Sequence, residues 1–225
     1  IWRLDNHFLF FNYDWANLPD LADPPSLKNG CITFGCFGSA GKVNDDIIAL
    51  WARIMHCVPG SRMYVRSSPL GSIANGDFMS MRFARHGIGA DRLRLEGATD
   101  WGTFIKSYDD VDITLDTWPY CGANTVAESI WQGVPVITLM GSRFSSRYGA
   151  SHVTAAGCSE LAAESPERYI EIASKLAAAP ERLLHYRRNL RRMSLEHGLS
   201  DPVRFARKLE QAYEQMLNQL PGNAR

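Results

Sequence analysis

Residues 111–137 have the pattern strand, turn, helix, turn, strand, which constrains the fold more than any other stretch of this sequence. A short apolar run ends at Asp116, turn residues including Gly122 follow, and helix formers continue through residues 127–131. Gly133 can end that helix before the next apolar run. The start of such a helix presents free N–H groups and the positive end of the helix dipole above the sheet, where an anion such as a diphosphate binds.

Apolar runs of strand length alternate with amphipathic segments over most of the chain. Because strands that alternate with helices of about a dozen residues are typical of α/β folds, we predict a Rossmann-like parallel sheet with helices on both faces. The expected strands are residues 31–37, 63–66, 93–96, 112–115 and 136–139. The expected helices are residues 45–58, 78–86, 101–108, 127–131, 145–156, 166–178, 180–194 and 202–217.

Length, charge and cysteine usage narrow the class of protein. The 225 residues suffice for one large domain with attachments, and 24 basic residues balance 24 acidic ones, which argues against a nucleic-acid-binding role. No apolar run reaches the roughly 20 residues of a membrane helix, so no membrane partner is expected. Five scattered cysteines without zinc-site spacing favour a reducing compartment, and we predict a cytoplasmic protein.

The domain organisation is predicted from local composition. Residues 1–30, which are rich in aromatics and prolines, read as a linker from a missing N-terminal lobe. Residues 31–200 are expected to form the Rossmann-like domain, and residues 201–225 a C-terminal helix and tail. The chain starts with Ile rather than Met, which we interpret as the sign of a longer parent protein.

Ligands in such folds bind beyond the carboxyl ends of the strands, so the site residues should come directly after strands. The candidate segments are residues 38–42, 66–69, 97–101, 116–125 and 140–147. One such segment is residues 38–42, where small residues including Ser39 would let backbone N–H groups approach a phosphate and Lys42 would supply charge. It matches neither the Walker A motif nor the G-x-G-x-x-G fingerprint. An ordinary tight turn with a solvated lysine is the alternative.

Residues Gly122, Ala123, Asn124 and Thr125 form the second such segment. Glycine permits close approach of a ligand, and Asn124 or Thr125 can cap the following helix and bond a phosphate oxygen. Glu128 lies one turn after Asn124 on the same helix face, where its carboxylate could accept both hydroxyls of a ribose. The alternative is a capped helix with a surface glutamate.

A third segment, residues 97–101, contains Thr99 and leads into a short helix with Trp101 and Phe104 on one face. These aromatic side chains would either stack on a nucleobase or pack against neighbouring helices. His152, inside an expected helix, is interpreted as structural. No Ser-His-Asp arrangement, paired catalytic carboxylates or metal cluster is visible, so the chemistry that the sequence displays is binding.

Taken together, these motifs resemble the C-terminal catalytic lobe of the O-linked N-acetylglucosamine transferase/SPINDLY family. The matching positions are residues 32–37, Lys42, residues 115–120, Gly122, Ala123, Thr125, Glu128, Trp131, residues 133–136, Ser146, Arg147, residues 149–151, Phe205, Leu209, Glu210 and Tyr213. The resemblance covers nearly the whole chain from about residue 30.

The resemblance implies one half of a GT-B glycosyltransferase, in which two Rossmann-like lobes hold a nucleotide-sugar donor mainly through the C-terminal lobe. It implies transfer of a sugar, N-acetylglucosamine from UDP-N-acetylglucosamine, to Ser or Thr hydroxyls of proteins, with no metal or other cofactor required. Tetratricopeptide repeats commonly precede the lobes in this family. By position, Lys42 corresponds to the diphosphate-binding lysine, Asn124 and Thr125 to the hydroxyl pair at the diphosphate-binding helix, and Glu128 to an acidic ribose ligand. Trp101 and Phe104 fall where the family contacts the base.

The chain also departs from the family pattern in the donor pocket. Relatives usually carry Asn where Cys121 stands and Thr where Asn124 stands, and more polar residues at the positions of Trp101 and Phe104. Three alternatives therefore stay open: a GDP-fucose-dependent O-fucosyltransferase, another GT-B transferase, and a non-catalytic nucleotide-binding module. Because groups of the other lobe would be missing, we expect the chain by itself to bind UDP or GDP weakly and to transfer nothing.

Overall fold

Six parallel strands form the sheet in the computed structural model, which describes residues 20–199 and 201–219. The strand order is β3-β2-β1-β4-β5-β6, and it reverses between β1 and β4, the position at which folds of this type bind ligands. The strands are β1 (Thr33–Cys36), β2 (Arg62–Arg66), β3 (Leu93–Glu96), β4 (Ile113–Leu115), β5 (Val136–Leu139) and β6 (Ala162–Ala163).

Side chains that alternate along the strands pack into two hydrophobic layers. Phe34 and Cys36 of β1 lie in the larger layer. Phe37, which directly follows β1, and Tyr64 of β2 lie in the smaller one. The α-helices are α1 (Ser26–Asn29), α2 (Asp45–Cys57), α3 (Ile73–Ala84), α4 (Trp101–Lys106), α5 (Asn124–Trp131), α6 (Tyr148–Ala155), α7 (Pro166–Ala177), α8 (Pro180–His197) and α9 (Pro202–Asn218). Short 3-10 helices include η2 (Ala40–Lys42), η3 (Ser68–Gly71), η5 (Ser107–Asp110) and η6 (Phe144–Ser146).

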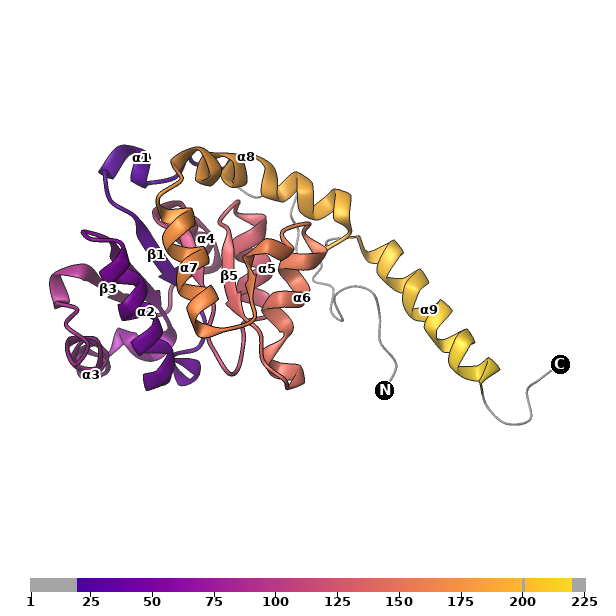
Figure 1. Cartoon of the computed structure of the whole chain (residues 1–225), viewed down its shortest axis with the longest axis horizontal. Helices are drawn as coiled ribbons and strands as arrows, with labels where there is room; N and C mark the ends of the chain where they lie inside the picture. Colours follow the sequence, from indigo (N-terminus) through magenta and orange to yellow (C-terminus); the bar gives the residue numbers. More distant parts are fainter. Residues whose placement is uncertain (1–19, 200, 220–225) are drawn as a thin grey trace.

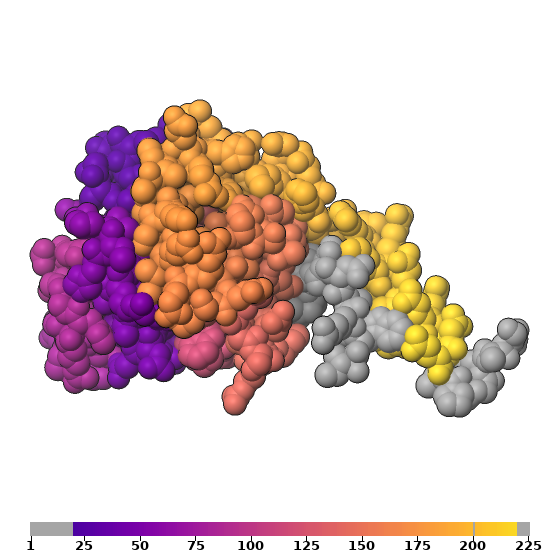
Figure 2. All heavy atoms as spheres, in the orientation of Figure 1, coloured from indigo at the N-terminus to yellow at the C-terminus, as the bar shows by residue number. Residues whose placement is uncertain are grey.

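Figure 1 shows α2 and α7 side by side on one face of the sheet, with α8 above them, and contacts join α2 to α7 and α7 to α8. The last helix, α9, projects away from the sheet (Figure 1 and Figure 2). Among the described residues no helix is both long and apolar enough to cross a membrane.

The predicted Rossmann-like sheet with helices on both faces is confirmed, and each predicted strand is present to within two residues at its ends. Three helices begin elsewhere than predicted. Helix α5 starts at Asn124 rather than at residue 127. Helix α3 starts at Ile73 rather than at residue 78, and the sequence pattern missed this start because the first turn contains Asn75 and Gly76, which are poor helix formers. The predicted helix 145–156 is divided into η6 and the shorter α6.

Two elements were not predicted. Strand β6 consists of two alanines, which carry no strand pattern in the sequence, and it is defined by parallel pairing with β5. Helix α1 lies inside the predicted linker, and Asp112 accepts a hydrogen bond from the backbone N–H of Ser26 at its start. Residues 1–19 of the predicted linker lie outside the described part of the chain. The two proposed boundaries, after residues 30 and 200, stay predictions.

Candidate functional site

The loop between β4 and α5 is organised by the buried carboxylate of Asp116, directly after β4. Its Oδ1 accepts hydrogen bonds from the backbone N–H groups of Thr117 (2.9 Å) and Gly122 (2.7 Å), and its Oδ2 accepts one from the Thr138 hydroxyl (2.8 Å). Burial raises the pKa of Asp116 to about 6, and these three donors act in the opposite direction. Asp116 therefore fixes the turn that leads into α5.

Two side chains of the β1–α2 segment reach across the switch point to this loop. Lys42 donates from Nζ to the carbonyl of Cys121 over 3.0 Å, and its ammonium lies 3.8 Å from the ring centre of Tyr120. Asn44, the N-cap residue of α2, donates from Nδ2 to the carbonyl of Trp118 over 2.8 Å. The two segments predicted to hold a diphosphate therefore meet, with a positive charge beside the start of α5.

The chain is tightly packed where it enters α5. A Cβ atom on Gly122 would lie 2.8 Å from the hydroxyl of Thr125 and 3.3 Å from the carboxylate of Asp116, so only glycine fits without a shift. The prediction that Asn124 or Thr125 caps the helix is wrong, because α5 starts at Asn124 and Ala123 takes the N-cap position. The carboxylate of Asp116 binds the N–H of Gly122 just ahead of this helix.

Glu128 lies one turn after Asn124, as its spacing predicts. It is only 3% exposed, so the alternative of a surface glutamate is wrong. The whole helix from Val126 to Trp131 is buried, and α5 packs against both α6 and α8. Any contact of Glu128 with a ribose would therefore be made by a carboxylate held rigidly inside the protein.

The two aromatic residues of α4 for which a role was predicted differ in their burial. Phe104 packs in the smaller hydrophobic layer, with its ring centre 5.9 Å from those of Phe37 and Tyr108. Trp101 stacks on Phe104 at 5.7 Å and keeps 46% of its surface exposed. The hydroxyl of Tyr108 donates to the carbonyl of Thr125 over 3.1 Å, which ties this aromatic cluster to the first turn of α5.

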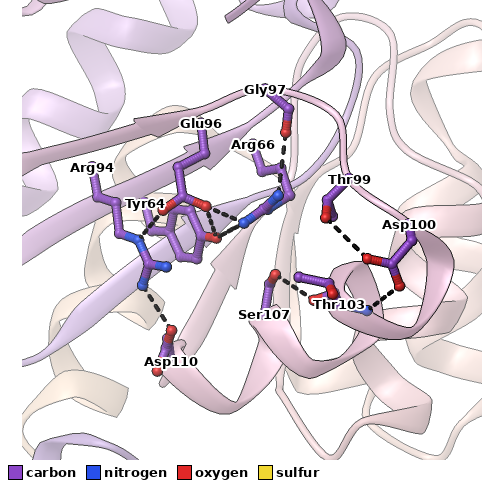
Figure 3. A network of polar contacts seen from close by, with 10 residues as sticks. All are labelled: Tyr64, Arg66, Arg94, Glu96, Gly97, Thr99, Asp100, Thr103, Ser107 and Asp110. Atoms are coloured by element: carbon purple, nitrogen blue, oxygen red, sulfur yellow. Dashed lines mark hydrogen bonds and ion pairs between the residues drawn. The ribbon is translucent and has the colours of Figure 1, made fainter. Parts of the chain in front are cut away.

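A polar network holds the start of the β3–α4 loop in place (Figure 3). Arg66 at the end of β2 is buried, and its guanidinium bonds the Tyr64 hydroxyl, the carboxylate of Glu96 and, over 3.2 Å, the carbonyl of Gly97. The Tyr64 hydroxyl also donates to Glu96 over 2.7 Å. The start of the loop is therefore anchored to β2, the neighbouring strand.

The remaining predicted residues lie in the connecting loops. Thr99 is exposed and donates to the carboxylate of Asp100 over 3.3 Å, and Asp100 caps α4 by accepting from the backbone N–H of Thr103. Ser39 is exposed in the turn before η2, on the same segment as Lys42. The next residue in that segment donates its backbone N–H to the hydroxyl of Ser67, over 2.8 Å, which links the loops after β1 and β2.

Two residues of this edge, Asn44 and Tyr108, lie outside the segments that the sequence singles out. Arg66, Asp116 and Tyr120 lie inside those segments, but no role was predicted for any of them. All five act through contacts with residues that local sequence patterns do not reveal. His152 is buried as predicted, and burial lowers its pKa to about 4, so it is neutral at pH 7.

No group of three or more His, Cys, Asp and Glu side chains within residues 20–199 and 201–219 is placed to hold a metal ion. All five cysteines are free thiols. The predicted site residues that the structure describes most fully at this edge are Lys42, the buried Glu128 and the exposed Trp101.

The doubly wound sheet has the strand order common to Rossmann-like folds, and its superposition on a solved O-GlcNAc transferase identifies it as one lobe of a GT-B glycosyltransferase. The model of glycosyl transferase family 41 matches residues 24–209, and the chain belongs to this family. This confirms the resemblance on which the sequence analysis relied.

Relatives and solved structures agree with that assignment. A probable UDP-N-acetylglucosamine–peptide N-acetylglucosaminyltransferase SPINDLY of Petunia hybrida is 33% identical over 219 residues, which cover 95% of this chain and 23% of that protein. A protein of Arabidopsis thaliana with the same description but the name SEC is 29% identical, over 94% of this chain and 22% of its own length. This chain therefore spans about a quarter of the curated relatives that it matches.

Among solved structures, a mutant O-GlcNAc transferase of Thermobaculum terrenum superimposes with a TM-score of 0.85 at 31% identity, over 95% of this chain and 40% of that one. TarM of S. aureus superimposes with a TM-score of 0.60 at 13% identity, over 94% of this chain and 39% of that one, and shares the fold alone.

Proposed function

We propose that this chain is the donor-binding half of a glycosyltransferase that moves N-acetylglucosamine from UDP-N-acetylglucosamine onto Ser and Thr hydroxyls of proteins. The observation that carries the proposal is the contact of Lys42 with Tyr120 and the carbonyl of Cys121. It holds a cation beside the first turn of α5, where a helix attracts a diphosphate. The names of the relatives support the choice of donor and acceptor.

The donor would lie along the carboxyl edge of the sheet. Its diphosphate would meet Lys42, the backbone at Gly122 and Ala123, and the side chains of Asn124 and Thr125. Glu128 would accept the ribose hydroxyls and Trp101 would stack on the base, with Phe104 supporting that ring. Ser39 and Thr99 would line the two ends of this path.

The reaction we propose is direct displacement at the anomeric carbon. The oxygen of the acceptor hydroxyl forms a bond to that carbon, the bond from the carbon to the β-phosphate oxygen breaks, and UDP leaves with the electron pair. The acceptor proton passes to a base of the other lobe or to solvent. Lys42 and the N–H groups at the start of α5 would stabilise the charge that develops on the leaving diphosphate.

The wider setting belongs to the same proposal. We propose that no metal takes part, since one lysine and a helix start supply the positive field. The partners would be a protein acceptor, an N-terminal lobe and tetratricopeptide repeats of a longer chain. A cytoplasmic location is supported by five free thiols, three of them buried.

Incubation of the full-length protein with UDP-N-acetylglucosamine, or separately with GDP-fucose, and a cell-extract protein mixture tests the proposal. Mass spectrometry should find N-acetylhexosamine on Ser and Thr, undiminished by a chelator, and no transfer of fucose. Transfer of fucose, or labelling that persists unchanged in Lys42→Ala, would contradict the proposal.

A further inference from the structure

A hollow of about 500 Å³ opens between α2 and α7, beside the candidate donor site. Its lining residues are Asp46, Ala49, Leu50, Arg53, Trp118, Leu139, Met140, Glu164, Pro166 and Glu167. Several of them follow strands or begin helices at the carboxyl edge of the sheet. The hollow is of the size that proteins use for ligands, which is roughly 300–1,000 Å³.

This hollow is distinct from the donor site but shares one wall with it. None of the residues assigned above to the donor lines it. Trp118 does, and the carbonyl of Trp118 accepts the hydrogen bond from Asn44 that joins the two donor-binding segments. An occupant of the hollow would therefore contact the loop that carries Tyr120 and Cys121 against Lys42.

The inner wall of the hollow is apolar. Leu50 and Trp118 are partly buried and pack against the core, and Leu139 is buried at the end of β5. Such a wall suits the methylene stem of a long side chain, and an indole ring attracts a cation that approaches its face.

The rim is acidic. Three exposed carboxylates, those of Asp46, Glu164 and Glu167, face a single guanidinium, that of Arg53. No ion pair within the described residues involves any of the four. By contrast Glu171, one turn further along α7, pairs with both Arg168 and Lys175.

Helix stability explains two of these carboxylates but not all three. Asp46 and Glu167 lie in the first turns of α2 and α7, where acids favour the helix. Glu164 precedes the N-cap residue of α7 and has no such role. The rim of the hollow therefore carries more negative charge than the stability of α2 and α7 accounts for.

We infer that this hollow binds a short segment of the acceptor protein that carries a lysine or an arginine near the modified hydroxyl. The inference rests on the proposed function for the identity of the partner. The stem of the basic residue packs on Trp118 and Leu50, and its charge meets the rim carboxylates. A volume of about 500 Å³ exceeds one side chain, so two or three consecutive residues enter.

Fluorescence anisotropy with the full-length protein tests the binding step directly. The probes are two labelled pentapeptides, Leu-Arg-Ser-Leu-Arg and its counterpart with glutamate in place of both arginines. The arginine peptide should bind about tenfold more tightly or better, since each exposed charge pair contributes up to about fivefold. Glu167→Lys should remove most of that preference.

Glu181→Lys is the matched control, because Glu181 follows a proline at the first position of α8 just as Glu167 does in α7. It should leave peptide binding unchanged. Glu164→Lys should have the same effect as Glu167→Lys. Because Glu164 lies outside any helix, that result would show that the effect of Glu167→Lys is not due to unfolding of α7. Equal binding of the two peptides, or an equal loss in Glu181→Lys, overturns the inference.

A second measurement separates this inference from the proposed function. Lys42→Ala should weaken UDP binding while the arginine peptide still binds. A wild-type protein that fails to bind UDP but keeps its peptide preference would refute the proposed function alone. In transfer assays, Glu167→Lys should raise KM for acceptors with a basic residue near the serine and leave KM for UDP-N-acetylglucosamine unchanged. An unchanged acceptor KM refutes the acceptor subsite.

Discussion

Replacement of Lys42 by alanine tests the proposed diphosphate site most directly. Lys42 already has two partners, the carbonyl of Cys121 at 3.0 Å and the ring of Tyr120 at 3.8 Å. Both hold the ammonium at the switch point before any ligand is present. A diphosphate would therefore meet a preorganised charge, and little side-chain entropy would be lost on binding.

The size of the effect follows from these contacts. A hydrogen bond to a charged group contributes about 1.5–3 kcal/mol, and competition with the Cys121 carbonyl lowers the net value by up to about 0.5 kcal/mol. Lys42→Ala should therefore weaken UDP binding by about 1–3 kcal/mol, which is roughly 5- to 150-fold in Kd. The fold should survive, because the side chain lies at the edge of the sheet rather than in its core.

Isothermal titration of the full-length protein with UDP measures this change. Lys106→Ala is the control, because Lys106 is an exposed lysine in the last turn of α4 and its loss changes the net charge equally. Its Kd should stay within about twofold of the wild type, since distant exposed charges are screened by salt. An unchanged Kd in Lys42→Ala, or an equal loss in both variants, would refute the assignment.

Three further predictions concern the β4–α5 segment. Because burial raises the pKa of Asp116 from 3.8 to about 6, the folded state binds its proton more tightly than the unfolded state does. The free energy of unfolding should therefore fall by roughly 3 kcal/mol as pH rises from about 4 to about 7, and urea titrations of Asp116→Asn should lack that slope. Gly122→Ala should destabilise the fold by about 1–3 kcal/mol and weaken UDP binding, whereas Gly76→Ala, with no atom within 4 Å, should stabilise α3 by about 0.5–1 kcal/mol in thermal melts. If Glu128 accepts the ribose hydroxyls, the wild type should bind UDP more tightly than 2′-deoxy-UDP, and Glu128→Ala should bind both equally; an identical preference in both proteins would remove Glu128 from the site.

The sheet could be predicted from the sequence because its strands are apolar runs between clear turn residues. Val136–Leu139, for example, is entirely buried, and all its residues except Thr138 are apolar. Strand β6 could not be predicted, because Ala162 and Ala163 are a strand only through their pairing with β5. The predicted start of α3 was five residues too late, because Asn75 and Gly76 in its first turn have low helix propensity.

The site was predictable in part, at the level of which loops meet. The rule that ligands lie beyond the carboxyl ends of parallel strands selected the segments of Lys42 and Gly122, and the structure brings these two segments into contact. It could not reveal that Asp116 binds both Thr138 and Gly122, because such contacts depend on the packing of β4 against β5. The rule also gave no measure of burial, which is why the sequence could not decide whether Glu128 is a ribose ligand or a surface residue.

The structure further distinguishes the two positions at which this segment departs from its family. The side chain of Cys121 is fully buried, 3.8 Å from the Thr138 hydroxyl, and burial raises the pKa of its thiol to about 12, so it is a neutral packing group. Only its backbone carbonyl faces Lys42, and any residue would supply that carbonyl. Asn124 instead is exposed at the first position of α5, among the N–H groups that a diphosphate would use. A change in donor preference relative to other members of the family should therefore be sought at Asn124 and at the exposed Trp101, and not at Cys121.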